Sequence, residues 1–256
     1  MTVRRVRIAA VSYLNTIPLL YGIEHAEHLH AQLLLSSPDR CAEAFKAGEA
    51  DLALLPVSAL PEIQNADIVT SYCLGTTESM RTAVLYSNVP TEQIRRVWLD
   101  RRSCAFAALT RILAKKSWKI APEWLEMENY SVMDRPAEGD AFLVIGDNTL
   151  DRQRSFVHAC DLAGCWKKLT RLPFVFAVWV ARKEVAPETL DALEEALTWG
   201  IEHTWEAIVQ YGYEGSDFAY DYLTREIDYL FDSEKQKALK KFWEDGLKAT
   251  LRVNPG

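Results

Sequence analysis

The chain has 256 residues, 49% of them hydrophobic, which is enough for one large domain or for two lobes with their own cores. The formal net charge of −7 argues against a nucleic-acid partner, because phosphate binding needs a basic face. The five cysteines are an odd number without a CxxC pair, which indicates reduced thiols in a cytoplasmic protein. A disulfide framework and a zinc ribbon are thereby excluded.

The first element in chain order is an apolar strand, expected over residues 4–10. It leads through the polar turn 12–16, Ser-Tyr-Leu-Asn-Thr, into an apolar helix with Pro18 in its first turn. Such a turn directs free backbone N–H groups beyond the strand, where the positive end of the helix dipole also favours anions. Asn15 or Thr16 can cap the helix. The alternative is an ordinary first βα unit without a ligand.

Short continuous apolar runs predict further strands, as expected for strands that helices cover on both faces. The expected strands are 32–35, 52–55, 68–72, 82–87, 96–99, 141–145 and 174–181. Helical patterns fall between them, at 38–47, 104–115 and 189–211, with two more helices between 218 and 248. This alternation favours an α/β fold with mainly parallel sheets.

The order of the elements predicts two lobes. We expect the first lobe to comprise residues 1–87 and 178–256, and the second to comprise residues 88–177. A chain that leaves its first lobe and returns makes two crossings, and these act as hinges. Lobes of this kind hold a small ligand in the cleft between them.

Four polar turns follow predicted strands or begin predicted helices, at 12–16, 36–39, 100–103 and 146–149. Ligands of open α/β sheets bind beyond the carboxyl ends of the strands, so these turns are expected to converge on one cleft. Their hydroxyl, amide and N–H groups suit a metabolite that carries carboxylates. Taken singly, each turn is also explained as a helix cap.

Standard catalytic motifs are absent from the sequence, which has no GxSxG, GxxxxGK[ST], GxGxxG or HExxH. The histidines at 25, 28 and 30 have no second acidic cluster, so we interpret them as a solvated helix end and predict no metal site. Polar residues interrupt the apolar stretch near the N-terminus, so it does not fit a signal peptide. No stretch has membrane-spanning length, and no membrane partner is expected.

Four segments occur in an order that resembles the chorismate dehydratase family of the futalosine route to menaquinone. They are SYLNTIPL at 12–19, GEADLALLPVSAL at 48–60, IGD at 145–147 and LPFVFAVW at 172–179. Together they extend over nearly the whole chain. The IGD segment is unspecific by itself, whereas the other three are specific.

The resemblance implies a two-lobe fold like the type II periplasmic binding proteins, with the ligand cleft between the lobes. It also implies a dehydration without cofactor or metal, which converts chorismate to 3-[(1-carboxyvinyl)oxy]benzoate. In the family, the substrate's own enolpyruvyl carboxylate is thought to remove the ring proton. Since the product ring is aromatic, the protein mainly has to position a dicarboxylate and exclude water.

The resemblance also implies the site residues. Asn15 and Thr82 are the expected catalytic residues. The expected substrate-binding residues are Ser12, Tyr13, Asn15, Ser58, Thr82, Ser103, Asp147 and Arg171. Arg171 stands where the family commonly has a small residue, and it either supplies a cation to a carboxylate or lies at a lobe edge.

Two departures from the family pattern leave other functions open. Ala105 and Phe106 replace two hydroxyl residues at the expected carboxylate site, and Glu78 adds a negative charge in the loop 75–80. These residues motivate an alternative, a non-catalytic cytoplasmic protein that binds a small carboxylic acid. A later, naphthoate-forming enzyme of the same pathway is a third possibility. The sequence leaves a monomer and a homodimer equally open.

Overall fold

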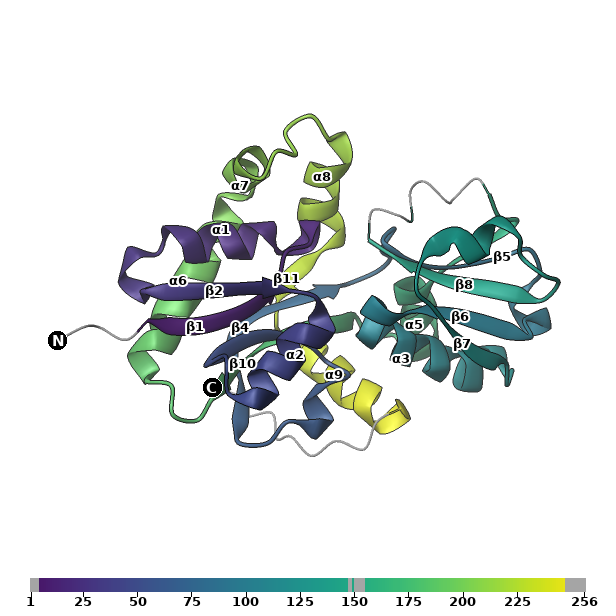
Figure 1. Ribbon diagram of the computed structural model, residues 1–256, viewed down its shortest axis with the longest axis horizontal. Helices are drawn as coiled ribbons and strands as arrows, with labels where there is room; N and C mark the ends of the chain where they lie inside the picture. The colour runs from purple at the N-terminus through teal and green to yellow at the C-terminus, as the bar shows by residue number, and fades with distance from the viewer. Residues whose placement is uncertain (1–4, 147–148, 150–154, 247–256) are drawn as a thin grey trace.

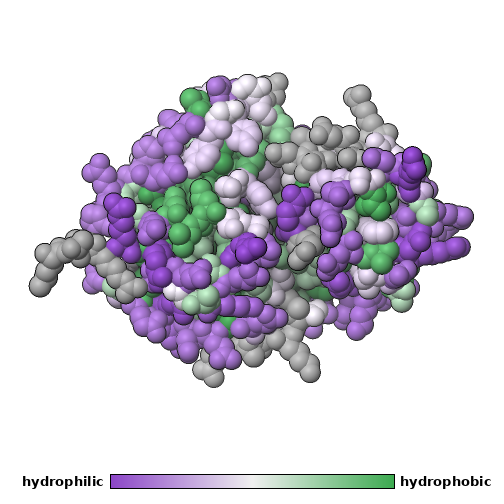
Figure 2. Space-filling view, viewed as in Figure 1, coloured by the Kyte–Doolittle hydropathy of each residue, from purple (hydrophilic) through white to green (hydrophobic). Residues whose placement is uncertain are grey.

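The structure is a computed structural model that describes residues 5–146, 149 and 155–246 (Figure 1). Two sheets, each flanked by helices, form two lobes beside each other. The face of the molecule in Figure 2 is mostly hydrophilic over both lobes. In the described part of the chain, no helix has the length and apolar character needed to cross a membrane.

The first lobe contains a six-stranded sheet in the order β11-β4-β10-β3-β1-β2. β1 pairs in parallel with β2 and β3, whereas β10 pairs antiparallel with β3 and β4, and β11 antiparallel with β4. Its strands are β1 (Val6–Val11), β2 (Ala31–Ser36), β3 (Leu52–Pro56), β4 (Ala66–Thr76), β10 (Phe174–Arg182) and β11 (Asp228–Leu230). Its helices are α1 (Ile17–His25), α2 (Pro38–Ala47), α6 (Pro187–Glu202), α7 (Thr204–Gln210), α8 (Asp217–Asp221) and α9 (Ser233–Gly246).

The second lobe contains a five-stranded sheet in the order β7-β6-β8-β5-β9. β6 pairs in parallel with β7 and β8, and β5 pairs antiparallel with β8 and β9. The strands are β5 (Ala83–Ser87), β6 (Arg96–Asp100), β7 (Glu123–Met127), β8 (Asp140–Ile145) and β9 (His158–Asp161). The helices are α3 (Cys104–Leu113) and α5 (Leu162–Thr170).

The sheets are mixed, not mainly parallel as the alternation of elements predicts. The reason is the path of the chain, which leaves the first lobe after β4 and returns along β10, in the opposite direction. The lobe boundaries differ as well. β5 lies wholly in the second sheet and β10 wholly in the first, so the crossings fall at 77–82 and 171–173 and not after 87 and 177.

The observed helices and strands differ from the expected ones most where the chain is exposed. The helix expected over 189–211 is divided at His203 into α6 and α7. The strands β7, β9 and β11 are not anticipated by the apolar runs, because each is short and has exposed positions. Periodicity identifies a strand poorly when so few of its residues face a core.

Three aromatic side chains join the lobes beside the crossings. Trp166 of α5 contacts Phe174 of β10 and Phe242 of α9 in edge-on geometry, with ring centroids 5.9 and 6.2 Å apart. Phe174 and Phe242 lie 5.6 Å apart. Trp166 Nε1 also donates a 2.8 Å hydrogen bond to the carbonyl of Pro173. Such pairs stabilise beyond their buried area, so the lobes share a core at this point.

Candidate functional site

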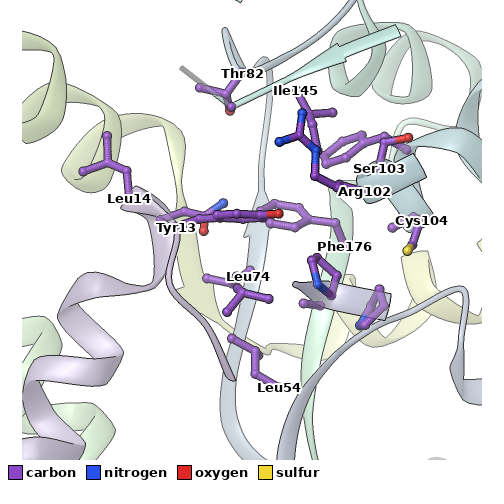
Figure 3. Close-up of a pocket in the computed structure, with 18 of the residues that line it drawn as sticks. Tyr13, Leu14, Leu54, Leu74, Thr82, Arg102, Ser103, Cys104, Ile145 and Phe176 are labelled. Carbon is purple, nitrogen blue, oxygen red and sulfur yellow. The ribbon is translucent and has the colours of Figure 1, made fainter. Parts of the chain in front are cut away.

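A cavity of about 240 Å³ lies between the two lobes (Figure 3). Residues of both sheets and of the crossing before β5 form its wall. The polar or charged lining residues include Ser12, Tyr13, Asn15, Thr82, Arg102, Ser103, Cys104, Tyr213 and Tyr222. The apolar ones include Leu54, Leu74, Met80, Ala105, Phe106, Ile145 and Phe176. This composition suits a small ligand with an apolar body and a few polar groups.

The turn after β1 is held in shape by Thr16, which is fully buried. Its hydroxyl accepts a 3.1 Å hydrogen bond from the N–H of Tyr13 and lies 2.7 Å from the carbonyl of Val11. The hydroxyl of Tyr229 in β11 donates to the carbonyl of Asn15 at 3.0 Å. Because the backbone is fixed at both points, the side chains of Tyr13 and Asn15 are presented to the cavity in a defined orientation.

A hydrogen-bonded group of three side chains connects this turn with the second lobe. Thr82 donates to the phenol oxygen of Tyr222 at 2.8 Å, and Asn15 Nδ2 lies 3.4 Å from the same oxygen. Thr82 and Tyr222 are buried. Asn15 Oδ1 is also buried, and it has no hydrogen-bond partner among the residues that the structure describes. A buried acceptor without a donor is costly, so this oxygen is a natural partner for a ligand hydroxyl.

The turn after β6 places the side chain of Arg102 in the cavity wall. Asp100 accepts from Arg102 Nε at 3.1 Å and from Arg102 Nη2 at 2.8 Å, and the hydroxyl of Tyr130 donates to Asp100 at 2.5 Å. Figure 3 shows Arg102 and the ring of Tyr13 extending into the same space. Ser103 donates to the carbonyl of Asp100 at 2.6 Å and immediately precedes α3.

These contacts determine the charge state of the turn. Burial opposes ionisation of Asp100, but the hydrogen bonds from Arg102 and Tyr130 outweigh it and hold the pKa of that carboxyl below its usual value. Asp100 therefore stays ionised, and its two hydrogen bonds hold the guanidinium of Arg102 in one orientation. The arrangement combines a fixed guanidinium with the positive end of α3, and both favour a ligand carboxylate.

Aromatic rings form the wall near the start of α3. Phe106 lies 5.4 Å from Phe174 and 5.3 Å from Phe176, measured between ring centroids. Phe106 and Ala105 both line the cavity, where hydroxyl groups are common in the resembled family. The phenol of Tyr13 is neutral at pH 7 and can act as a hydrogen-bond donor, and burial raises its pKa further.

The structure brings together five of the predicted site residues, since Ser12, Tyr13, Asn15, Thr82 and Ser103 all line the cavity. Two others lie elsewhere. Ser58 lies in the turn after β3 and is not among the lining residues. Arg171 is exposed at the end of α5, where its φ of +66° terminates the helix, and it does not reach the cavity. Asp147 lies outside the described residues.

Glu78 does not bring a negative charge into the cavity. Its side chain is 75% exposed and lies 3.3 Å from Lys167 Nζ, outside the cavity lining. Of the two alternatives for Arg171, its exposure agrees with a position at a lobe edge, and Arg102 is an arginine that lines the cavity. The sequence contained a signal for Arg102, because it belongs to the polar turn 100–103. No sequence signal indicated Tyr222, which follows Asn15 by 207 residues and belongs to a helical segment.

Comparisons of the sequence with known proteins agree with this geometry. A family model described as menaquinone biosynthesis matches residues 6–246. A protein of Thermus thermophilus named chorismate dehydratase is 25% identical over 213 residues, which cover 74% of this chain and 75% of that protein.

Solved structures show the fold. A protein from Archaeoglobus fulgidus superposes with a TM-score of 0.76 at 16% identity, covering 96% of this chain and 97% of that one. An alkanesulfonate-binding protein of Xanthomonas axonopodis pv. citri, bound to MOPS, gives a TM-score of 0.64 at 16% identity, covering 95% and 93%. These likenesses establish a two-lobe fold of the periplasmic-binding-protein type. Since the family model extends over almost the entire chain, the protein belongs to the menaquinone biosynthesis family.

Proposed function

We propose that the protein is a chorismate dehydratase, a hydro-lyase that removes water from chorismate to give 3-[(1-carboxyvinyl)oxy]benzoate. The observation that carries the proposal is the interlobe cavity, whose lining includes both Asn15, with its buried acceptor Oδ1, and Arg102. Family membership and the relative named chorismate dehydratase support the same activity.

Five polar residues of the cavity wall have a task in this reaction. Arg102 and the N–H groups at the start of α3 bind one carboxylate of the substrate, next to Ser103. Asn15 Oδ1 accepts a hydrogen bond from the ring hydroxyl and orients it for departure. Thr82 and Tyr222 hold the amide of Asn15 in place.

The reaction breaks one C–H bond and one C–O bond of the ring, and the proton and hydroxide leave together as water. The second substrate carboxylate, on the enolpyruvyl group, takes this proton first and passes it to the departing hydroxide, so that water is released. The pair of electrons from the C–H bond completes the aromatic ring, which supplies the driving force. The residues of the chain therefore act by holding the reactive conformer in a cavity with apolar walls.

The proposal is tested by incubating the purified, metal-stripped protein with chorismate and separating the products by chromatography with ultraviolet detection. We expect an aromatic enol ether that does not form in the protein-free control. If folded protein binds chorismate and leaves it unchanged, the proposal is wrong.

A binding protein is the second candidate, favoured by the apolar residues Ala105 and Phe106 in the cavity wall. An alkanesulfonate-binding protein has the same fold, and a shared fold does not by itself imply a shared function. A thermal-shift series of small carboxylic acids distinguishes the two candidates. Strong stabilisation by another acid, together with no turnover of chorismate, would favour the binding protein.

A further inference from the structure

Two thiols outside the cavity lie in direct contact. Cys160 in β9 and Cys165 in α5 place their sulfur atoms 2.7 Å apart, and both residues are half-buried. A disulfide has an S–S length of about 2.05 Å, so closing the bond requires a movement of less than about 1 Å. We propose that Cys160 and Cys165 form a redox-active dithiol site, which takes hydroperoxides or small-molecule disulfides as oxidants and closes to an intrachain disulfide.

The environments of the two thiols assign different roles to them. Cys165 lies in the first turns of α5, where the helix dipole favours a thiolate. A hydrogen bond from the thiol of Cys160 lowers the pKa of Cys165 and outweighs burial and the charge of Asp161, which raise it, while the charge of Lys168 also lowers it. That hydrogen bond and burial raise the pKa of Cys160. Cys165 is therefore the attacking thiolate and Cys160 the resolving thiol.

The chemistry balances with a hydroperoxide as the oxidant. The Cys165 thiolate attacks the distal oxygen and becomes a sulfenic acid, while the O–O bond breaks and the departing oxygen takes a proton. The sulfur of Cys160 then attacks the sulfenic sulfur, and hydroxide leaves with the thiol proton as water. Two thiols are oxidised to one disulfide, and the peroxide is reduced. With a small disulfide, thiol–disulfide exchange gives the same product.

Among the five cysteines, position and burial favour oxidation of this pair. β9 is the edge strand of its sheet, so solvent reaches the pair from one side. Cys41 and Cys73 are fully buried, and burial raises the pKa of Cys41 to about 11. Burial also raises the pKa of Cys104, which lines the cavity. These three thiols are therefore poor nucleophiles near neutral pH.

The pair adjoins the crossing between the lobes. Asp161 follows Cys160, and its carboxylate caps α5 by accepting from the N–H groups of Ala163 and Gly164 at 3.0 and 3.2 Å. The same carboxylate accepts from the N–H of Met80, at 3.3 Å, and Met80 lines the cavity. The disulfide thus fixes a turn that contacts the wall of the interlobe cavity.

The test is a titration of the full chain with hydrogen peroxide, and separately with oxidised glutathione, followed by alkylation, trypsin digestion and mass spectrometry. Residues 155–167 contain both cysteines between Arg154 and Lys167, and the other three cysteines fall in other tryptic peptides. We expect peptide 155–167 to escape alkylation and to lose the mass of two hydrogens, and dithiothreitol to reverse the change. Full alkylation of this peptide after treatment, or a link to a different cysteine, would overturn the proposal.

Two variants test the assigned roles. In Cys160→Ser, the sulfenic acid on Cys165 has no resolving thiol, so dimedone is expected to label residue 165 after peroxide. In Cys165→Ser, residue 160 is expected to remain a thiol under the same treatment. Labelling of Cys160 in the second variant, at the rate seen for Cys165 in the first, would refute the assignment. The fold of each variant is checked by circular dichroism, and the readout does not depend on turnover.

Discussion

The hydroxyl groups of Thr82 and Tyr222 lie 2.8 Å apart, although the two residues are separated by 140 positions in the chain. Thr82 immediately precedes the first strand of the second lobe, and Tyr222 belongs to the helical segment after α8 in the first lobe. Their hydrogen bond joins the lobes at the cavity wall. The hydroxyl of Tyr222 also approaches Nδ2 of Asn15, which we propose to be a catalytic residue. It therefore links Asn15 with Thr82 in the crossing between the lobes.

Replacing Tyr222 with Phe should reduce turnover of chorismate about tenfold to a hundredfold, because Asn15 loses its orienting partner. The hydroxyl of Tyr222 accepts from both Thr82 and Asn15, so its loss should cost about 1–3 kcal/mol of unfolding free energy. Steady-state kinetics and urea denaturation measure the two effects. Tyr220→Phe is the matched control, because Tyr220 is 44% exposed and lies two residues earlier, in α8. Equal effects of the two substitutions would contradict the role of Tyr222.

Replacing Asn15 with Ala should affect turnover far more than stability. The side chain lines the cavity and its Oδ1 has no partner in the described residues, so removal should cost about a hundredfold or more in kcat. The unfolding free energy should change by less than about 1 kcal/mol. Kinetics and thermal denaturation provide the measurements. An unfolded variant, or one with intact turnover, would show that the turn after β1 has been assigned wrongly.

Arg102→Met should weaken substrate binding about tenfold to a hundredfold, since a charge-assisted hydrogen bond is worth about 1.5–3 kcal/mol. Calorimetric titration with chorismate measures this change. Arg96→Met is the matched control, because Arg96 makes a similar ion pair with Asp140 at 2.7 Å but does not line the cavity. Tyr130→Phe removes one hydrogen bond to the Asp100 carboxylate that holds Arg102, so we expect an intermediate loss of chorismate affinity. Unchanged affinity in Arg102→Met would exclude the guanidinium from carboxylate binding.

The Asp100 carboxylate predicts a pH dependence of stability. Its pKa in the folded protein is held below that of the unfolded chain, which is about 3.9, by hydrogen bonds from Arg102 and Tyr130 that outweigh burial. Ionised Asp100 therefore stabilises the fold above about pH 4. This contribution is lost as the pH falls through the folded pKa. Asp100→Asn should be less stable than the parent at pH 6, and the difference should shrink toward pH 3. Urea denaturation across this range checks the sign, and a constant difference would contradict it.

The packing of α1 against α6 depends on two glycines. A Cβ atom at Gly22 would collide with the carbonyl of Ala196, and one at Gly200 with the carbonyl of Pro18. Gly200→Ala should therefore destabilise the protein by about 3 kcal/mol, because both obstructions are backbone atoms. Gly215→Ala is the control, since no atom lies within 4 Å of its added Cβ. Similar denaturation midpoints for the two variants would contradict this close helix contact.

The sequence by itself determined the two-lobe architecture and one side of the site. The buried strands are continuous apolar runs, and the Ser-Tyr-Leu-Asn-Thr turn presents Tyr13 and Asn15 because local backbone hydrogen bonds fix its shape. These features depend on residues near one another in the chain, so pattern and turn chemistry are sufficient to predict them.

The tertiary structure alone decided which distant residues complete the site. Tyr222 reaches Asn15 only because the C-terminal helices pack back on the first sheet. Arg102 lines the cavity with its guanidinium held by Asp100, whose carboxylate also accepts a hydrogen bond from Tyr130. Arg171, adjacent to a specific sequence segment, is directed to solvent by the end of α5. Long-range packing sets these positions, and local sequence patterns do not predict contacts between residues far apart in the chain.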